Sequence, residues 1–229
     1  MSDFSPALKE GNRDPRVACA LLLDTSYSMS GEPIRQLNEG YKTFCDEVNE
    51  DPLARKRTEV TVITFGDRAQ VAVPFQEGRD LQPVEFSPSG ATPMGAALEL
   101  GLDQLETRKQ AYKEAGLEYY RPWLIVITDG APTDAHAAPA RRVRETEARK
   151  GVVVFAIGVN DADLGVLAQL SDARKPAMLE GLRFKELFQW LSASMGAVSR
   201  SVPGTSDAEV AQHEDEMTPL PTPQDWMHL

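Results

Sequence analysis

The chain has 229 residues, of which 41% are hydrophobic and 26% charged, and these values are typical of a globular protein with one domain. The formal net charge of −11 argues against binding to nucleic acids or to anionic membrane surfaces. Cys19 and Cys45 lie in apolar segments and give no sign of a disulfide scaffold. No apolar run reaches the roughly 18 residues of a membrane span, and the first five residues show no signal-peptide pattern. We therefore expect a soluble, cytoplasmic protein.

Short apolar runs predict the strands of a sheet. Four of them have the β-branched character of buried strands, and they cover residues 17–23, 60–65, 124–128 and 152–159. Residues 70–75 alternate in polarity and include a proline near their end, which predicts an edge strand. The turn at residues 66–69 makes this edge strand the antiparallel partner of the strand before it. A weaker last strand is expected at residues 177–179.

Apolar residues recur at three- and four-residue steps between these strands and predict helices. The clearest helical stripes cover residues 34–48, 94–105 and 184–198, and less regular ones cover residues 137–150 and 162–170. Strands that alternate with helices require crossover connections and therefore a mostly parallel sheet. The expected fold is α/β, with three layers (α/β/α) around an open, twisted sheet that has one antiparallel edge strand.

The composition changes after about residue 200. Residues 201–229 contain four prolines and six acidic residues, and they contain no lysine or arginine. Such a segment buries too little apolar surface to offset its ordering entropy. We therefore predict an N-terminal extension at residues 1–15, a folded domain at residues 16–200 and a flexible acidic tail at residues 201–229.

Oxygen-bearing side chains follow the predicted strands where ligand sites of open α/β sheets lie, at the carboxyl ends. Asp24, Ser26 and Ser28 come directly after the first strand and alternate with other residues, so an extended turn can point all three the same way. Thr92 opens a predicted helix, and Asp129 ends the strand at residues 124–128. Hydroxyls and carboxylates without histidine or thiol ligands suit a hard cation such as Mg²⁺, Mn²⁺ or Ca²⁺.

Each of these residues also has a purely structural interpretation. Asp24 and Ser26 could cap a turn, and Thr92 could be the N-cap of the following helix. Gly130 would let the backbone turn sharply after Asp129. Asp134 and His136 could form an outer shell of a metal site or could simply be solvated loop residues. The metal-site interpretation is favoured because five such positions occur together.

The pattern Asp24-x-Ser26-x-Ser28, followed by Thr92 and by Asp129-Gly130, resembles the metal-ion-dependent adhesion site (MIDAS) of von Willebrand factor A (VWA) domains. The resemblance covers about residues 16–199. It implies that Ser26, Ser28 and Thr92 are hydroxyl ligands of a divalent cation, most simply Mg²⁺, with Asp24 and Asp129 bound directly or through water. Tyr27 departs from the family pattern, which often has glycine there. Residues 31–34, 62–65 and 128–134 further resemble the bacterial cytosolic TerY-like branch found with tellurite-resistance genes.

The resemblance implies a metal-dependent protein-binding module that takes an Asp or Glu side chain from its partner. For a TerY-like protein it implies a bacterial stress-response assembly, with a Ser/Thr kinase or a protein phosphatase as partner. The sequence has no nucleophile elbow, P-loop or zinc-protease motif, and we expect no enzymatic activity. The alternative is a metal-assisted hydrolase or phosphatase that uses the same site.

The tail leaves three interpretations open. It could occupy the metal site as an autoinhibitory segment, it could end in a docking motif at residues 226–229, or it could be only a solubilising extension.

Overall fold

The computed structural model describes residue 8, residues 11–200 and residues 227–228. The described residues form a sheet in the strand order β3-β2-β1-β4-β5-β6-β7. The β2–β3 and β6–β7 pairs are antiparallel, and the other neighbours are parallel. The strands are β1 (Val17–Asp24), β2 (Thr58–Phe65), β3 (Ala69–Glu77), β4 (Trp123–Thr128), β5 (Val153–Val159), β6 (Ala177–Leu179) and β7 (Met227–His228).

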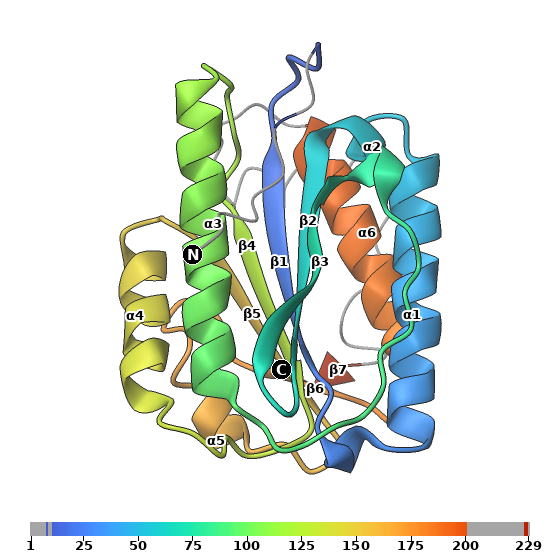
Figure 1. The fold of residues 1–229 in the computed structure, drawn as a ribbon, viewed down its shortest axis with the longest axis vertical. Helices are drawn as coiled ribbons and strands as arrows, with labels where there is room; N and C mark the ends of the chain where they lie inside the picture. The colour runs from blue at the N-terminus through green and yellow to red at the C-terminus, as the bar shows by residue number, and fades with distance from the viewer. Residues whose placement is uncertain (1–7, 9–10, 201–226, 229) are drawn as a thin grey trace.

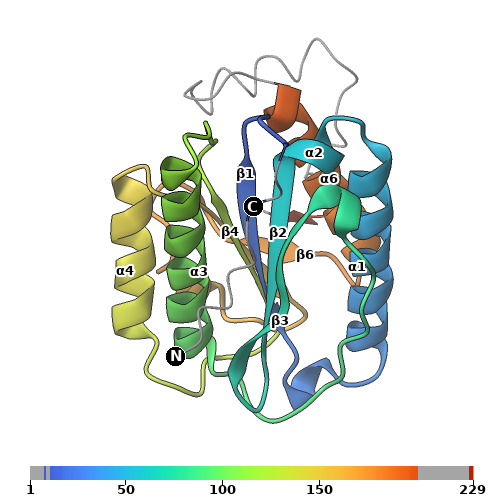
Figure 2. The ribbon, with the colours of Figure 1, turned by 45° about the horizontal axis from the view of Figure 1, so that its top comes forward.

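Helices cover both faces of the sheet (Figures 1 and 2). One face carries α1 and α6, and the other carries α3 and α4, which confirms the predicted three-layer α/β architecture. The α-helices are α1 (Glu32–Glu50), α2 (Ala54–Arg57), α3 (Met94–Glu114), α4 (Ala137–Ala148), α5 (Leu164–Leu167) and α6 (Phe184–Arg200). No helix in the described part of the chain is long and apolar enough to cross a membrane.

The central strand β1 shows why its sequence does not alternate in polarity. All eight of its residues are buried, because helices cover both of its faces. Leu21 and Leu23 pack in the apolar cluster under α1 and α6, whereas Leu22 packs in the cluster under α3 and α4. Packing on both faces holds β1 in place in the sheet and so positions the loop that follows it.

Two elements differ from the sequence-based expectations. The helix predicted at residues 162–170 is reduced to the single turn α5. It begins at Leu164, because the Asp163 side chain caps it by accepting the backbone N–H groups of Gly165 and Val166, and it ends at Leu167. The short strand β7 was not predicted and lies within the predicted tail. The rest of that tail, and residues 1–7 and 9–10, fall outside the described residues, so the predicted domain boundaries stay predictions.

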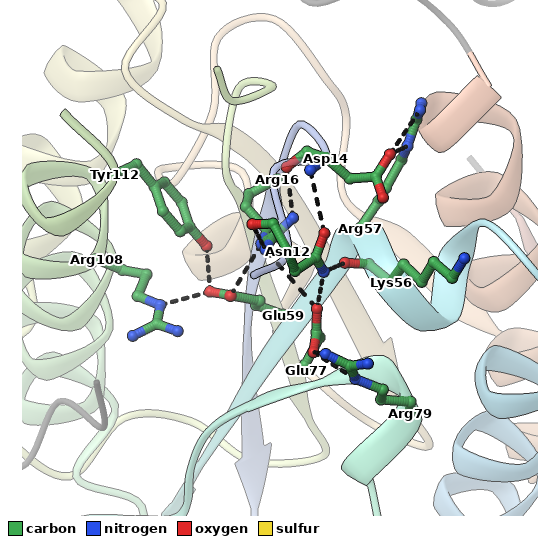
Figure 3. Close-up of polar contacts among 10 residues, drawn as sticks. All are labelled: Asn12, Asp14, Arg16, Lys56, Arg57, Glu59, Glu77, Arg79, Arg108 and Tyr112. Atoms are coloured by element: carbon green, nitrogen blue, oxygen red, sulfur yellow. Dashed lines mark hydrogen bonds and ion pairs between the residues drawn. The ribbon is translucent and has the colours of Figure 1, made fainter. Parts of the chain in front are cut away.

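A buried ionic cluster joins β2, α3 and the residue before β1 at the end of the sheet where β1 begins (Figure 3). Its centre is Glu59, whose carboxylate accepts hydrogen bonds from the Arg108 guanidinium and the Tyr112 hydroxyl and pairs with Arg16 at 3.3 Å. The side chains of Arg16 and Glu59 are 1% and 3% exposed. The cluster also fastens the start of the described chain, because Asn12 donates to the Lys56 carbonyl at 2.8 Å.

Candidate metal centre

The five predicted ligand residues lie at the opposite end of the sheet, where the parallel strands end (lower edge in Figure 1). Asp24 is the last residue of β1, and Ser26 and Ser28 follow it in the loop and 3₁₀ turn before α1. Thr92 lies two residues before α3, and Asp129 directly follows β4. Because β1 and β4 are parallel neighbours, their ends and the loops beyond them meet at the same edge.

Three of the five side chains form a chain of hydrogen bonds. The Ser26 and Ser28 hydroxyl oxygens are 2.8 Å apart, and the Ser28 hydroxyl donates to Asp129 Oδ1 at 2.7 Å. Ser26 is buried, whereas Ser28 is exposed and Asp129 is partly exposed. The group therefore extends from the protein interior to the solvent.

Asp24 is fully buried, and both of its carboxylate oxygens have donors. Oδ1 accepts the backbone N–H of Ser26 at 2.8 Å, and Oδ2 accepts the hydroxyl of Thr128. Burial raises the pKa of Asp24, the hydrogen bonds from Ser26 and Thr128 oppose this rise, and the nearby charge of Asp129 adds to it. Burial likewise raises the pKa of Asp129, against the hydrogen bond from Ser28.

Gly130 shows how closely the remaining oxygens converge. A Cβ atom placed on Gly130 would lie 3.2 Å from Thr92 Oγ1, 3.7 Å from Ser28 Oγ and 3.8 Å from Asp24 Oδ2. The chain bends at Asp129 and Gly130, as expected from the sequence, and Gly130 does so without a positive φ. The missing side chain of Gly130 also leaves space for these oxygens. The fold thus brings together all five predicted residues.

Backbone hydrogen bonds hold the three loops against one another. Ser89 N–H donates to the Thr25 carbonyl at 2.7 Å, and Tyr27 N–H donates to the Gly90 carbonyl at 3.2 Å. Thr92 is clamped from the third loop, because its N–H donates to Thr133 Oγ1 at 3.1 Å and its carbonyl accepts Thr133 N–H at 2.9 Å. The hydroxyl of Thr92 is therefore positioned by the loop that carries Asp129.

The capping interpretations hold only in part. Thr92 does not cap α3, because the N-cap position is Pro93 and no side chain of that residue or of Thr92 caps the helix end. Asp134 takes that role from a distant loop, with its carboxylate accepting the N–H groups of Gly95 and Ala96 at 2.9 and 2.8 Å. Asp24 does stabilise its turn through Ser26 N–H, but its second oxygen faces the other candidate ligands.

Two supporting residues were not found from the sequence. Thr128 donates a hydrogen bond to Asp24, and Thr133 accepts one from the backbone of Thr92. In the sequence nothing distinguishes either residue from any other threonine at the end of a strand or in a loop. Asp134, which the sequence offered as an outer-shell candidate, supports α3, and His136 Nδ1 lies 3.4 Å from the Asp134 carbonyl. The sequence feature that could have indicated Thr128 is its position at the end of β4, directly before Asp129. Strand β4 is the parallel neighbour of β1, whose last residue is Asp24.

The donor set fits a hard divalent cation. The site offers two carboxylates and three hydroxyls. No group of three or more His, Cys, Asp or Glu residues that could hold a metal ion occurs in the described part of the chain. Mg²⁺ takes oxygen ligands at about 2.0–2.1 Å in an octahedron, which places neighbouring ligands about 2.9 Å apart. The separations of 2.8 and 2.7 Å along Ser26, Ser28 and Asp129 are close to that spacing.

Tyr27 stands next to this group and faces the solvent. Its side chain is 68% exposed, which makes it one of the exposed large hydrophobic residues of the described chain. Its backbone N–H donates a hydrogen bond to the Gly90 carbonyl, which holds the backbone at Tyr27 in place.

Two solved structures show the fold of this chain in other proteins. A pilus adhesin, SpaC, from Lactobacillus rhamnosus GG has a TM-score of 0.64 and 14% identity, over 82% of this chain and 32% of its own. Proximal thread matrix protein 1 from the mussel byssus, solved with a zinc-occupied MIDAS motif, has a TM-score of 0.54 and 19% identity, over 82% of this chain and 47% of its own. At these identities the likeness shows the fold alone.

Among curated proteins, mouse von Willebrand factor A domain-containing protein 2 is 25% identical over 202 residues, which are 88% of this chain and 24% of that protein. The human collagen alpha-5(VI) chain is 25% identical over 171 residues, which are 71% of this chain and 6% of the collagen chain. The chain thus spans a quarter or less of the length of these relatives. The family model of the von Willebrand factor type A domain matches residues 19–186, more than half of the sequence. The chain belongs to the von Willebrand factor type A domain family, whose members are metal-dependent adhesion and interaction modules.

Proposed function

We propose that this chain binds a partner protein through a divalent cation held by Asp24, Ser26, Ser28, Thr92 and Asp129. The observation that carries the proposal is the convergence of two carboxylates and three hydroxyls at one end of the sheet, with Ser28 and Asp129 accessible to solvent. The bound ion supplies a Lewis acid that accepts one further carboxylate oxygen from an Asp or Glu of the partner.

The charge of the site supports an acidic partner group. Two carboxylates offset the +2 charge of the ion, and three neutral hydroxyls are weak donors, so the ion stays electrophilic enough to accept one more carboxylate oxygen. The chain's own residues do three things here. Ser26, Ser28 and Asp129 present a row of oxygens, Thr128 and Ser26 N–H orient Asp24, and the clamp from Thr133 holds Thr92.

Tyr27 supplies the second part of the proposed recognition. An exposed aromatic side chain on a rigid loop loses little conformational entropy when a partner covers it, and tyrosine is enriched among residues that dominate binding energy. We assign to it an apolar contact beside the acidic residue of the partner.

For the resident ion we propose Mg²⁺, with Mn²⁺ as a close substitute. The support is the chemistry of the donor set, because two carboxylates and three hydroxyls without a histidine or thiol suit a small hard ion that keeps part of its water shell.

For the cellular setting we propose a cytoplasmic, bacterial, TerY-like protein in a tellurite-resistance or stress-response assembly, with a Ser/Thr kinase or a protein phosphatase as partner. The support is the resemblance of residues 31–34, 62–65 and 128–134 to that branch. Cys19 and Cys45 are both buried and unpaired, which suits a reducing compartment.

We also propose that the chain is not an enzyme. The Ser26 and Ser28 hydroxyls are hydrogen-bonded to one another and to Asp129, which suits ligands that must stay in place. The check is turnover of p-nitrophenyl phosphate with Mg²⁺ or Mn²⁺. Turnover that is lost in Asp24→Ala would contradict this part of the proposal.

The decisive experiment has two stages. Calorimetric titration of Mg²⁺, Mn²⁺ and Ca²⁺ into the metal-free chain should show one site, and Asp24→Ala and Thr92→Ala should lose it. Pull-downs from bacterial lysate with and without EDTA should then capture a partner only with the metal and only with the unaltered site. Asp103→Ala is the matched control, because Asp103 lies on α3 and pairs with Arg142 of α4, away from the site. Capture that is equal in all variants would refute the proposed function.

A further inference from the structure

The two edges of the sheet are protected in different ways. The edge strand β3 contains Pro74, which lacks a backbone donor, and its pairing with β2 has register irregularities between Val60 and Ile63. Proline and bulges are the usual means by which an edge strand avoids pairing with other chains. The β3 edge is therefore closed to further strands.

The edge on the other side is of the opposite kind. Strand β6 consists of Ala177, Met178 and Leu179, which are apolar and lack proline or charge, and two of them are buried. Its inner side pairs with β5 in parallel, and its outer side has backbone groups available for one more strand.

The chain's own C-terminal segment lies on this outer side. Met227 pairs with Leu179 and His228 pairs with Met178, in the antiparallel direction. Figure 1 shows β7 beside β6. The segment returns to the sheet after 26 residues, because α6 ends at Arg200 and β7 begins at Met227. A chain of 26 residues reaches at most roughly 90 Å, so seating on the same molecule needs no rearrangement of the domain.

The strand register places this edge at the same level of the sheet as Asp24. Thr128, whose hydroxyl holds Asp24, is paired with Gly158, Gly158 with Met178, and Met178 with His228. Asp24 is one residue past Leu23, the partner of Ile127, and so belongs to the same row. With about 4.8 Å between neighbouring strands, β7 lies roughly 19 Å from β1 at the level of the metal centre.

We propose that the outer edge of β6 is a strand-addition site for an extended peptide, and that its resident occupant is the C-terminal segment of the same chain. Pairing over two residues gives few hydrogen bonds, so the segment leaves and returns readily and a competing strand can replace it. This inference stands on the sheet edge alone and does not depend on metal binding.

Cysteine cross-linking in the full chain tests the seating. The double variants Met178→Cys/His228→Cys and Leu179→Cys/Met227→Cys join directly opposed residues. Because opposed pairs alternate between wide and narrow spacing, one of the two variants has the narrow spacing that favours a disulfide. Native Cys19 and Cys45 are 0% and 1% exposed, so they do not compete.

The control variant is Met178→Cys/His213→Cys, whose tail cysteine is joined to the domain by a shorter tether. Tethering alone would make this control cross-link at least as fast. We expect one in-register variant to form the intramolecular disulfide about tenfold faster than the control, with both variants retaining the thermal unfolding transition of the unaltered chain. Equal rates, or disulfide-linked dimers as the main product, would overturn the seating on the same chain.

A synthetic peptide of residues 219–229 tests the strand-addition site itself. Added in excess, it should slow the in-register cross-link severalfold, and the same residues in scrambled order should not. If the peptide has no effect on the rate, β6 does not accept an exchangeable strand and the proposal fails.

Discussion

Substitution of Thr128 tests whether this residue supports metal binding in addition to the stability of the fold. Its hydroxyl donates to Oδ2 of Asp24, which is fully buried, and it also lies 3.2 Å from the backbone nitrogen of Gly130. Thr128→Val keeps the shape of the side chain and removes this donor. We expect weaker metal binding and lower stability, because Asp24 Oδ2 is left buried with one donor fewer.

The size of each effect follows from the geometry. A hydrogen bond to a charged group contributes about 1.5–3 kcal/mol, so the free energy of unfolding without metal should fall by roughly that amount. Residues that orient a metal ligand typically change metal affinity by about 10–100-fold when they are removed. Thr128→Ser keeps the hydroxyl and should recover most of the affinity.

Thr61→Val is the matched control. Thr61 is also a buried threonine in a central strand, and its hydroxyl donates to the Val73 carbonyl at 2.8 Å, in a different part of the sheet. Urea unfolding in EDTA should show both valine variants destabilised, whereas calorimetric titration with Mg²⁺ should show weaker binding only for Thr128→Val. If both variants bind Mg²⁺ equally well, Thr128 does not position a ligand and our account of Asp24 is wrong.

Three further predictions address the supporting structure. Glu59→Gln should lower the free energy of unfolding by about 3–5 kcal/mol in urea titrations, because it removes the carboxylate charge that pairs with buried Arg16 and Arg108, whereas Glu32→Gln, at an exposed pair, should leave the urea midpoint unchanged. Gly90→Ala should weaken Mg²⁺ binding in calorimetry and lower the melting temperature, because φ is +62° there and a Cβ would lie 2.5 Å from Asp67 N. Burial tends to raise the pKa of Asp51, but the N–H groups of Ala54 and Leu53 and the Arg200 guanidinium lower it overall below 3.8. The stability that Asp51 contributes is therefore present above about pH 4 and lost as the pH falls through its folded pKa, so unfolding measured at pH 7 and pH 3 should differ less in Asp51→Asn.

The sequence predicted the central strands well because their burial on both faces leaves a plain apolar signal. The runs at residues 17–23 and 124–128 correspond to β1 and β4 within one residue at each end. Elements held by few contacts were harder to predict. The turn α5 depends on the Asp163 cap, and β7 exists only through its pairing with β6, which is distant in sequence. Local periodicity cannot report such pairing.

All five candidate ligands came from spacing and from the resemblance, and the structure brings their side chains together. The supporting residues could not be predicted in the same way. Thr133 reaches Thr92 and Asp134 reaches the N-terminal end of α3 only because the loop after β4 folds back over the start of that helix. These contacts join residues about 40 positions apart, and a single sequence shows no pattern for them.

The two ends of the sheet differ in how their buried charges are arranged. Asp24 and Asp129 are like charges, and burial and mutual repulsion both work against the charged form of Asp24. A site of this kind costs stability until a cation enters, so the rest of the domain must hold the loops in place. At the far end of the sheet Glu59 and Arg16 show the opposite arrangement, since opposite charges compensate one another there. The compensated charges and the candidate ligands thus lie at opposite ends of the same strands, and Tyr27 is exposed at the end that holds the candidate ligands.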